Sequence, residues 1–595
     1  MFSSVTLEEI LPQVRKPARY LGNEWNVVKK DFFKQEVKFA ICFPDLYEIG
    51  MSNLGLRIIY GLLNSQQGVS CERVFLPDID MLEILRARKI PLFSLESKMA
   101  LIEFDFIGFT LSYELGYTNV LAMLELAQLP FLACERNLDF PLVIAGGSCA
   151  SNPEPLADFI DLFLIGEAEE ALLEIIETYK KLQVTGHKPE GSACLPAGRV
   201  WQPNSQSHRS QVNKEDILRE LAKVEGVYVP SLYEVEYDSS GAVKKFSPKY
   251  HDIPRKVRKR IVKNLDQAYY PVNWLVPYVQ IVQDRACIEL MRGCPHRCNF
   301  CQARSIYHSL RMRSPEKVLE LTHKIQQFSG YEEFSFLSLS ASDYPFLSEI
   351  INSVSEKFQE QAIAVSLPSL RPKAYLGTVA AFLARVRKTT LTFAPEAGSE
   401  KLRRRINKDF DIGELYAAVL ASYKAGWRAI KLYFIIGLPD EDYEDLDGIL
   451  EIASWVWRLR KEAVGKPGEV RLSISLFIPK PHTVFEREAM ESEDVLREKI
   501  LYLRRKSRAL PRAISLDFHN LESSIIEAAL SRGDRTLGGV LLNAYKKGCL
   551  LDAWTEHFRF GLWISAFREC NKQFASYLKA KSNDEILPWQ HIELL

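Results

Sequence analysis

Three cysteines near the middle of the chain are the residues best suited to chemistry. Cys294, Cys298 and Cys301 follow one another with C-x3-C-x2-C spacing. A tight loop with this spacing can place three thiolates on three corners of a 4Fe-4S cube, which leaves the fourth iron without a protein ligand. An open iron can bind and activate a small molecule, so the spacing predicts a cluster at which a reaction takes place.

The neighbouring residues support a cluster loop. Gly293 relieves crowding where the backbone approaches the cluster, and Pro295 stiffens the turn after the first ligand. A structural zinc site is the alternative, with His296 or a distant cysteine as its fourth ligand. Zinc motifs usually pair two C-x2-C units, and the sequence contains no second such pair, so the cluster is the favoured interpretation.

Length and composition are those of a multidomain globular protein. The chain has 595 residues, 47% apolar and 26% charged, whereas a single core stops growing at about 250 to 300 residues. The cysteines outside the loop are scattered without a disulfide-like framework, which fits a reducing compartment. The first residues lack a signal-peptide pattern and no apolar run is long enough for a membrane span, so we expect a cytoplasmic protein without membrane contact.

Charge is balanced over the whole chain but not locally. Lysine plus arginine equals aspartate plus glutamate at 76 each, so net charge gives no general attraction to nucleic acid. Residues 244–263 form a basic segment that could hold the phosphates of RNA. A solvated face or an interdomain contact is favoured, because no aromatic residues alternate with the charges. The segment contains Lys244, Lys245, Lys249, Arg255, Lys256, Arg258, Lys259, Arg260 and Lys263.

Residues 37–181 alternate short, mainly apolar runs with helical patterns. Such runs are typical of strands that are buried on both faces, so they predict an α/β domain with a doubly wound parallel sheet. Ligands of such sheets bind beyond the carboxyl ends of the strands. The residues just after the runs are Asp45 to Gly50, Ser112 to Glu114, Gly146 to Ser148 and Gly166 to Glu169.

The chain divides further by pattern. The segment from Ala286 to about Arg508 repeats strand then helix six times, and six parallel strands with right-handed crossovers would curl into a partial barrel. The cluster loop then lies at the carboxyl end of the first strand. We expect an N-terminal sheet domain over 1–183, a flexible insertion over 184–213, a connecting β-rich and basic segment over 214–282, the core over 283–510 and a helical extension over 511–595.

The cluster loop within this repeat resembles the radical S-adenosylmethionine (radical SAM) superfamily. The resemblance implies a partial (β/α)6 barrel, the three loop cysteines as metal ligands, and an open iron that binds the amine and carboxylate of SAM. One-electron reduction by an external donor of the flavodoxin or ferredoxin type would then release a 5'-deoxyadenosyl radical. Phe300 matches the aromatic residue that packs near the adenine.

The same resemblance assigns residues at other strand ends of the core. Ser338 and Ser340 lie where the superfamily often has a G-G-E segment that binds the SAM amino group. Glu396 lies in a segment whose acid contacts the SAM ribose or amine, and Arg404 is a candidate for the SAM carboxylate. Gly437 belongs to the segment that cradles adenine. No catalytic residue beyond the cluster ligands is predicted.

The N-terminal domain resembles a cobalamin-binding (B12-type) domain, whose signature after the first strand is D-x-H-x-x-G. Asp45 and Gly50 match this signature, and Gly146 and Gly147 correspond to its paired glycine near the nucleotide tail. Tyr47 stands where a histidine would ligate cobalt, and it is a poor substitute. Either cobalamin binds without that axial ligand or the corrinoid was lost. The glycines would serve a tight turn equally well.

Taken together, the motifs resemble a bacterial family of B12-binding-domain radical SAM proteins of uncharacterised function. The resemblance implies an enzyme that modifies an unknown substrate through a deoxyadenosyl radical, with cobalamin as a further candidate cofactor for methyl transfer. RNA modification is an alternative that the basic segment motivates. A non-catalytic protein with a structural or electron-carrying cluster is the other alternative, and four protein ligands on the cluster would distinguish it.

Overall fold

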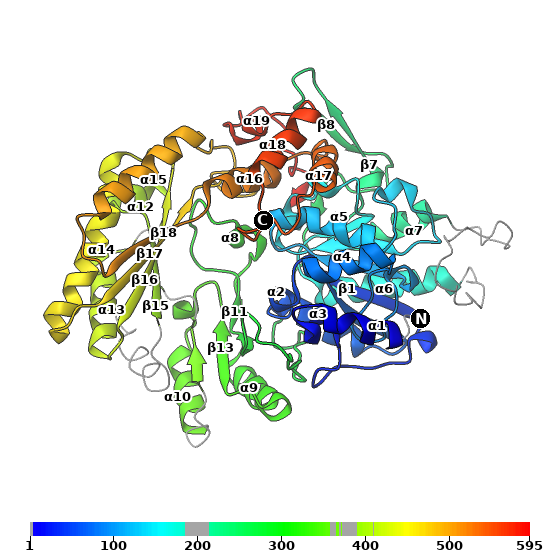
Figure 1. Ribbon diagram of the computed structural model, residues 1–595, viewed down its shortest axis with the longest axis horizontal. Helices are drawn as coiled ribbons and strands as arrows, with labels where there is room; N and C mark the ends of the chain where they lie inside the picture. The colour runs from blue at the N-terminus through cyan, green and yellow to red at the C-terminus, as the bar shows by residue number, and fades with distance from the viewer. Residues whose placement is uncertain (1–3, 185–212, 358–363, 368–370, 372–389, 409) are drawn as a thin grey trace.

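The N-terminal part of the chain forms a six-stranded sheet (Figure 1, blue to cyan) with the order β2-β1-β3-β4-β5-β6. All neighbouring strands are parallel except β5 and β6, which confirms the predicted α/β class. Strand β6 lies in the segment that was expected to be β-rich, but its pairing with β5 of the N-terminal sheet was not predicted. The strands are β1 Val37–Phe43, β2 Val69–Phe75, β3 Phe106–Thr110, β4 Leu142–Gly146, β5 Leu162–Leu164 and β6 Val227–Tyr228.

Helices connect these strands as a doubly wound sheet requires. Strand β1 is almost continuously apolar and buried, as expected for a strand covered on both faces. The first long helix begins at Asn53, whose side chain accepts a hydrogen bond from the backbone N–H of Leu56. The main helices are α3 Leu54–Asn64, α4 Ile79–Arg88, α5 Tyr117–Leu126 and α6 Ala168–Val184.

The part of the chain with the predicted strand–helix repeat contains two parallel sheets, one of three strands and one of four. In the four-stranded sheet, β16 and β17 pair without interruption from Ala429 opposite Glu469 to Ile436 opposite Leu476. Helices α13 and α14 pack against this sheet through a shared apolar core. The elements are β10 Ala286–Glu289, β13 Glu333–Leu337, β14 Ala364–Ser366, β15 Thr390–Glu396, β16 Ala429–Ile436, β17 Glu469–Leu476, α13 Ile412–Lys424 and α14 Tyr443–Val464.

One further strand corrects the prediction that residues 511–595 form a helical extension. Strand β18, Ile514–Phe518, pairs in parallel with β17, so the sheet continues past residue 510. Its apolar and polar residues alternate with period two, which is the pattern of a half-buried strand at a sheet edge. The expected extension therefore begins inside the sheet.

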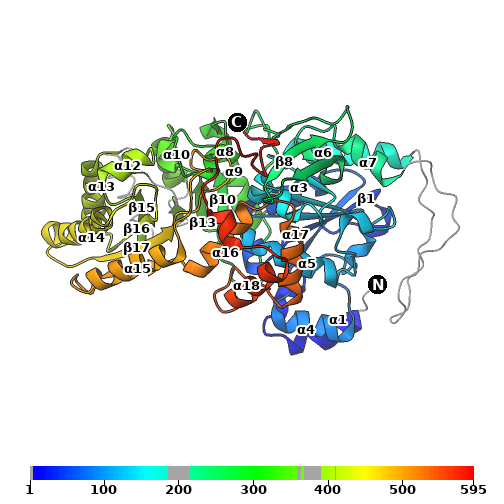
Figure 2. The same ribbon diagram turned by 90° about the horizontal axis from the view of Figure 1, so that it is seen from above.

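The C-terminal helices lie between the two large sheets, as Figures 1 and 2 both show. Helix α16 contributes to two apolar clusters: Ile526 and Leu530 pack into that of the N-terminal sheet, whereas Leu521 and Ile525 pack into that of the three- and four-stranded sheets. This helix therefore joins the two halves of the molecule. The helices are α16 Leu521–Ser531, α17 Leu537–Lys546, α18 Phe560–Glu569 and α19 Phe574–Leu578.

In the connecting segment, which was expected to be β-rich, β7 Tyr233–Tyr237 and β8 Val243–Pro248 form an antiparallel hairpin. Farther on, β9 Val257–Arg258 pairs with β19 Ile592–Glu593. Among the residues that the structure describes, no helix combines the length and apolar character needed to cross a membrane. Nearly all of the expected insertion, 184–213, lies outside the described residues. These are 4–184, 213–357, 364–367, 371, 390–408 and 410–595.

Candidate functional site

The cluster loop is closed by a short antiparallel ribbon. Strand β11, Met291–Arg292, pairs with β12, Arg311–Met312, and the three cysteines lie in the loop between them. Gly293 has a φ of 94°, and a Cβ there would lie 2.8 Å from the backbone oxygens of Tyr307 and Ser309. Only glycine fits this position, so the loop returns close to its own start.

The three cysteine thiols are free and partly buried. Burial raises the pKa of Cys294 and of Cys298, so a bound cation would be needed to hold both as thiolates. Within the described ranges, no three His, Cys, Asp or Glu side chains are grouped to hold a single metal ion. A four-iron cube takes one thiolate at each of three corners, so its ligands need not converge on one point.

A chain of hydrogen bonds fixes the middle of the loop. Arg371 donates to Nδ1 of His296, so the ring proton lies on Nε2, which donates to Oδ2 of Asp343 at 2.7 Å. Asp343 ends a 3-10 turn, Ala341–Asp343, just after β13. The loop residue between the first two cysteines is thus held by a carboxylate and a guanidinium from neighbouring strand ends.

The expected Ser338 and Ser340 also lie after β13, and both are engaged within their own turn. The hydroxyl of Ser340 donates to Asp343, and its backbone N–H donates to Oγ of Ser338 at 3.1 Å. Asp343 was not among the expected residues because the segment has no G-G-E letters. The feature of the sequence that could have identified Asp343 is its position, three residues after Ser340 and just past a predicted strand.

Glu396 lies beside the loop, and its expected contact with SAM stays a prediction. It ends β15 with a φ of 67°, which is unusual for a residue other than glycine and often marks a functional site. Oε1 of Glu396 lies 2.8 Å from Nζ of Lys408, and both side chains are largely buried. Burial raises the pKa of Cys298, whereas the positive charge of Lys408 opposes that rise, so this ion pair lies close to the thiol.

The prediction for Arg404 is wrong. Its side chain is 69% exposed on α12, Glu400–Arg405, and pairs with Glu400 one turn earlier. A residue four positions later, Lys408, follows the end of that short helix and turns back toward Glu396. The helix ends at Arg405, so its register could not be extended from the sequence to find this lysine.

Phe300 and the segment that contains Gly437 are brought together. Phe300 packs against a small apolar group that includes Leu438, Ala397 and Phe477, all just after strands of the four-stranded sheet. Gly437 has a φ of 79°, and its N–H donates to Oε2 of Glu441 at 2.7 Å. Burial raises the pKa of Glu441 to about 7. The Gly437 N–H is thus already used, so an adenine here would meet the apolar surface and the remaining backbone groups.

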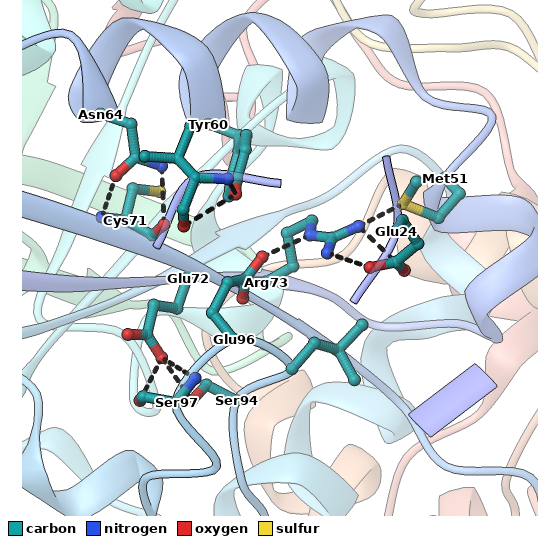
Figure 3. Close-up of polar contacts among 12 residues, drawn as sticks. Glu24, Met51, Tyr60, Asn64, Cys71, Glu72, Arg73, Ser94, Glu96 and Ser97 are labelled. Carbon is teal, nitrogen blue, oxygen red and sulfur yellow. Dashed lines mark hydrogen bonds and ion pairs between the residues drawn. The ribbon is translucent and has the colours of Figure 1, made fainter. Parts of the chain in front are cut away.

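Tyr47 does not fit the role of a cobalt ligand. It is 2% exposed, and its hydroxyl donates to Oε1 of Glu24 at 2.8 Å inside the N-terminal domain. Figure 3 shows the ion pairs on the other side of Glu24, where Arg73 lies between Glu24 and Glu96 at 2.8 and 2.6 Å. A corrinoid would have to bind here without a protein ligand from position 47.

The other expected corrinoid residues serve contacts within the chain. Oδ1 of Asp45 accepts a hydrogen bond from the indole of Trp554 at 2.9 Å. A Cβ on Gly50 would lie 2.3 Å from the ring of Phe75, and a Cβ on Gly147 would lie 2.5 Å from a backbone oxygen. Gly146 has room for a Cβ at ordinary contact distance. Close packing within the chain therefore explains why glycine occupies positions 50 and 147, without any ligand.

The basic segment is partly an interdomain contact, as favoured from the sequence. Nζ of Lys259 is buried and donates to the carbonyls of Ser305 and Ile306 at 2.8 and 3.1 Å, at the end of the helix that follows Cys301. Arg260 pairs with Glu170 and Glu174 on α6 at 2.8 Å. The exposed members are Lys244, Lys245, Lys249, Arg255, Lys256, Arg258 and Lys263.

Comparison with known protein families agrees with this geometry. Residues 288–453 match the family model described as "Radical SAM superfamily", and residues 55–195 match "Radical SAM proteins, N-terminal". The match over residues 288–453 contains the cluster loop, the His296–Asp343 contact and the Glu396–Lys408 ion pair. The chain therefore contains a radical SAM domain over residues 288–453. It is an enzyme of this class, whose members use a 4Fe-4S cluster and SAM and need an electron donor.

A protein of Methanocaldococcus jannaschii, "Uncharacterized protein MJ0966", is 27% identical over 88% of this chain and 97% of its own. It is archaeal, so the expected bacterial family stays a prediction. Among solved structures, TsrM from Kitasatospora setae with cobalamin and a 4Fe-4S cluster has a TM-score of 0.45 at 10% identity, covering 76% of this chain and 77% of its own. OxsB with aqua-cobalamin and SAM has 0.47 at 14%, covering 90% and 71%.

Proposed function

We propose that Cys294, Cys298 and Cys301 bind three irons of a 4Fe-4S cluster and that SAM binds the fourth. When bound and reduced, this pair supplies a 5'-deoxyadenosyl radical, which abstracts hydrogen from a substrate still to be identified. A donor of the flavodoxin or ferredoxin type in the cytoplasm is the proposed source of the electron. The observation that best supports the proposal is the buried Glu396–Lys408 pair beside the thiol of Cys298.

The charges beside the loop match the two charged groups of the methionine end of SAM. Lys408 and Arg371 can each donate to the SAM carboxylate, and Glu396 can accept from its ammonium group. His296 and Asp343 hold Arg371 in place by the hydrogen bonds described above. These groups are already paired in the protein, so binding exchanges partners rather than exposing an unpaired charge.

The apolar group around Phe300 suits the adenine side. Phe300 and Leu438 offer an aromatic edge and an aliphatic surface at the strand ends, where a planar base can be covered and water excluded. Phe477 and Phe485 pack edge to face behind them with ring centroids 5.7 Å apart. This support holds the surface rigid.

The proposal is tested by reconstituting the protein anaerobically with iron and sulfide, reducing it with dithionite in the presence of SAM, and assaying 5'-deoxyadenosine. We expect product from the wild-type protein and from Cys134→Ala, which removes an exposed cysteine outside the cluster loop. Cys298→Ala removes one ligand and should abolish product. A fully loaded wild-type cluster that shows no spectral change with SAM and yields no deoxyadenosine would contradict the proposal and favour an electron-carrying role.

Methyl transfer from cobalamin is a second candidate reaction, favoured by the sheet order β2-β1-β3-β4-β5 of the N-terminal domain. The inward Tyr47 means that position 47 would supply no axial ligand. Gel filtration after incubation with hydroxocobalamin decides the matter: corrinoid that co-elutes in a one-to-one ratio supports this reaction, and separation of the two contradicts it.

RNA is a candidate substrate because Arg255 and Lys256 are adjacent and exposed, whereas the neighbouring Val257 and Lys259 are buried. Neutralising the whole segment would damage the fold. The double variant Arg255→Ala, Lys256→Ala changes only exposed side chains, and weaker RNA binding with a shallower salt dependence would support the substrate class. Unchanged binding would contradict it.

A further inference from the structure

The ribbon that closes the cluster loop places two positive charges opposite each other. In the β11–β12 pairing, Arg292 lies directly across from Arg311. Like charges at opposed positions of a strand pair destabilise the pairing. The two guanidiniums therefore need a shared anion, and Cys294 of the cluster loop follows only two residues after Arg292.

That anion comes from the other half of the molecule. Glu167 follows β5 of the N-terminal sheet, and its Oε1 lies 2.7 Å from Nη2 of Arg311, while its Oε2 lies 3.1 Å from Nη1 of Arg292. Oε2 also accepts from Nη1 of Arg311 and from the backbone N–H of Val262, each at 2.7 Å. The side chain of Glu167 is 8% exposed, so this carboxylate binds the arginines of the ribbon rather than a ligand.

A second carboxylate from the same strand end completes the arrangement. Oε1 of Glu169 lies 2.8 Å from Nη2 of Arg292, and Glu289 binds Nε of the same guanidinium at 2.9 Å. Each of the three guanidinium nitrogens of Arg292 thus has a carboxylate partner. Two of these partners, Glu167 and Glu169, belong to the N-terminal domain. Both residues belong to the Gly166 to Glu169 segment, which lies at the ligand-binding side of a doubly wound sheet.

We infer that Glu167 and Glu169 are positioning residues through which the N-terminal domain holds the cluster loop and sets the electrostatic environment of the cluster. Two residues of extended chain span at most about 7 Å, so the Arg292 backbone lies within that distance of the Cys294 backbone. Neutralising Glu167 would remove one of the negative charges near the cluster. The reduced cluster carries one more negative charge, so that change stabilises it and makes the midpoint potential less negative.

The test compares Glu167→Gln with Glu170→Gln. Glu170 lies three residues later, but it pairs with Arg260 and is half exposed. Each reconstituted variant is characterised by iron and sulfide content, thermal unfolding, and midpoint potential from an EPR-monitored redox titration without SAM. We expect full loading in both, a less negative potential in Glu167→Gln, and a wild-type potential in Glu170→Gln.

An unchanged potential in fully loaded Glu167→Gln would overturn the inference and leave Glu167 as an interdomain ion pair alone. If this variant does not fold, Glu169→Gln is measured instead, because Glu169 approaches the ribbon through a single contact with Arg292; the same shift supports the inference, and none overturns it. The inference rests on the cluster of the proposed function. Because the titration omits SAM, a loaded protein that forms no deoxyadenosine would contradict the proposed function without deciding this point.

Discussion

At the scale of single residues, the site depends on charges whose partners the sequence does not reveal. Glu396 is a predicted site residue because its segment follows a predicted strand and carries a carboxylate, and the structure pairs it with Lys408. Arg404 was chosen for its type and proximity in sequence, yet it faces solvent. The direction in which Lys408 points depends on where helix α12 ends. No residue type in this segment marks the end of that helix.

The Glu396–Lys408 pair gives a direct prediction for SAM binding. In Lys408→Met the SAM carboxylate loses a charged donor worth about 1.5 to 3 kcal/mol, so the dissociation constant should rise about tenfold to a hundredfold. The binding of SAM to the loaded, unreduced cluster is measured by spectral titration. Arg404→Met is the matched control and should bind as the wild type does. Equal affinity of Lys408→Met and wild type would exclude Lys408 from the SAM site.

At the scale of elements, the period of the sequence identified the buried strands and missed the marginal ones. Strands β1 and β16 are long and mainly apolar, and they lie in the two parts of the chain for which the pattern predicted parallel sheets. Strand β18 lies at a sheet edge with alternating residues, and β6 has two residues that pair only because β5 is already in place. Such short or edge strands depend on tertiary neighbours more than on local preference.

The contact between helices α5 and α18 predicts a pH dependence of stability. Asp552 accepts hydrogen bonds from Thr118 on α5 at 2.9 Å and from the indole of Trp563 on α18 at 3.1 Å. Burial raises its pKa from 3.8 to about 6. Between these values the folded carboxyl keeps a proton that the unfolded one has lost, so its contribution to the free energy of unfolding falls as pH rises, by about 3 kcal/mol in all.

Asp552→Asn removes this titration. We expect the difference in free energy of unfolding between the variant and the wild type to shift in favour of the variant between about pH 4 and about pH 7, as measured by urea unfolding. Asp584→Asn changes an exposed aspartate and should leave the wild-type pH dependence intact. A constant difference between Asp552→Asn and wild type across the range would show that Asp552 titrates normally.

At the scale of the whole molecule, the sequence predicted two α/β halves and did not predict how they dock. The docking uses side chains far apart in the chain, such as Glu114 after β3 and Lys480 after β17, with Nζ to Oε1 at 2.7 Å. Each residue alone looks like an ordinary polar residue at a strand end. The same is true of Glu167 and Arg292, so no local pattern could have shown that the halves meet there.

Lys480 provides a test of this docking. Its ammonium group lies between Glu114 and Glu527, at 2.7 and 2.8 Å, and all three side chains are largely buried. Lys480→Met would leave two buried carboxylates without their shared partner, so we expect a loss of about 3 to 5 kcal/mol in the free energy of unfolding. Lys466→Met, at an exposed position, should cost little. A loss below about 1 kcal/mol for Lys480→Met would mean that the carboxylates find other partners.

The hydrogen bond between Trp554 and Asp45 joins residues 509 positions apart. During synthesis the N-terminal sheet can form once its last strand, which ends at Tyr228, has been made, but Trp554 follows it by 326 residues. At about 5 to 20 residues per second, this takes about 16 to 65 seconds. Throughout that interval the sheet lacks this cover on its carboxyl edge, so each newly made molecule passes through a period in which that edge can meet a chaperone or a small ligand that the finished protein meets differently.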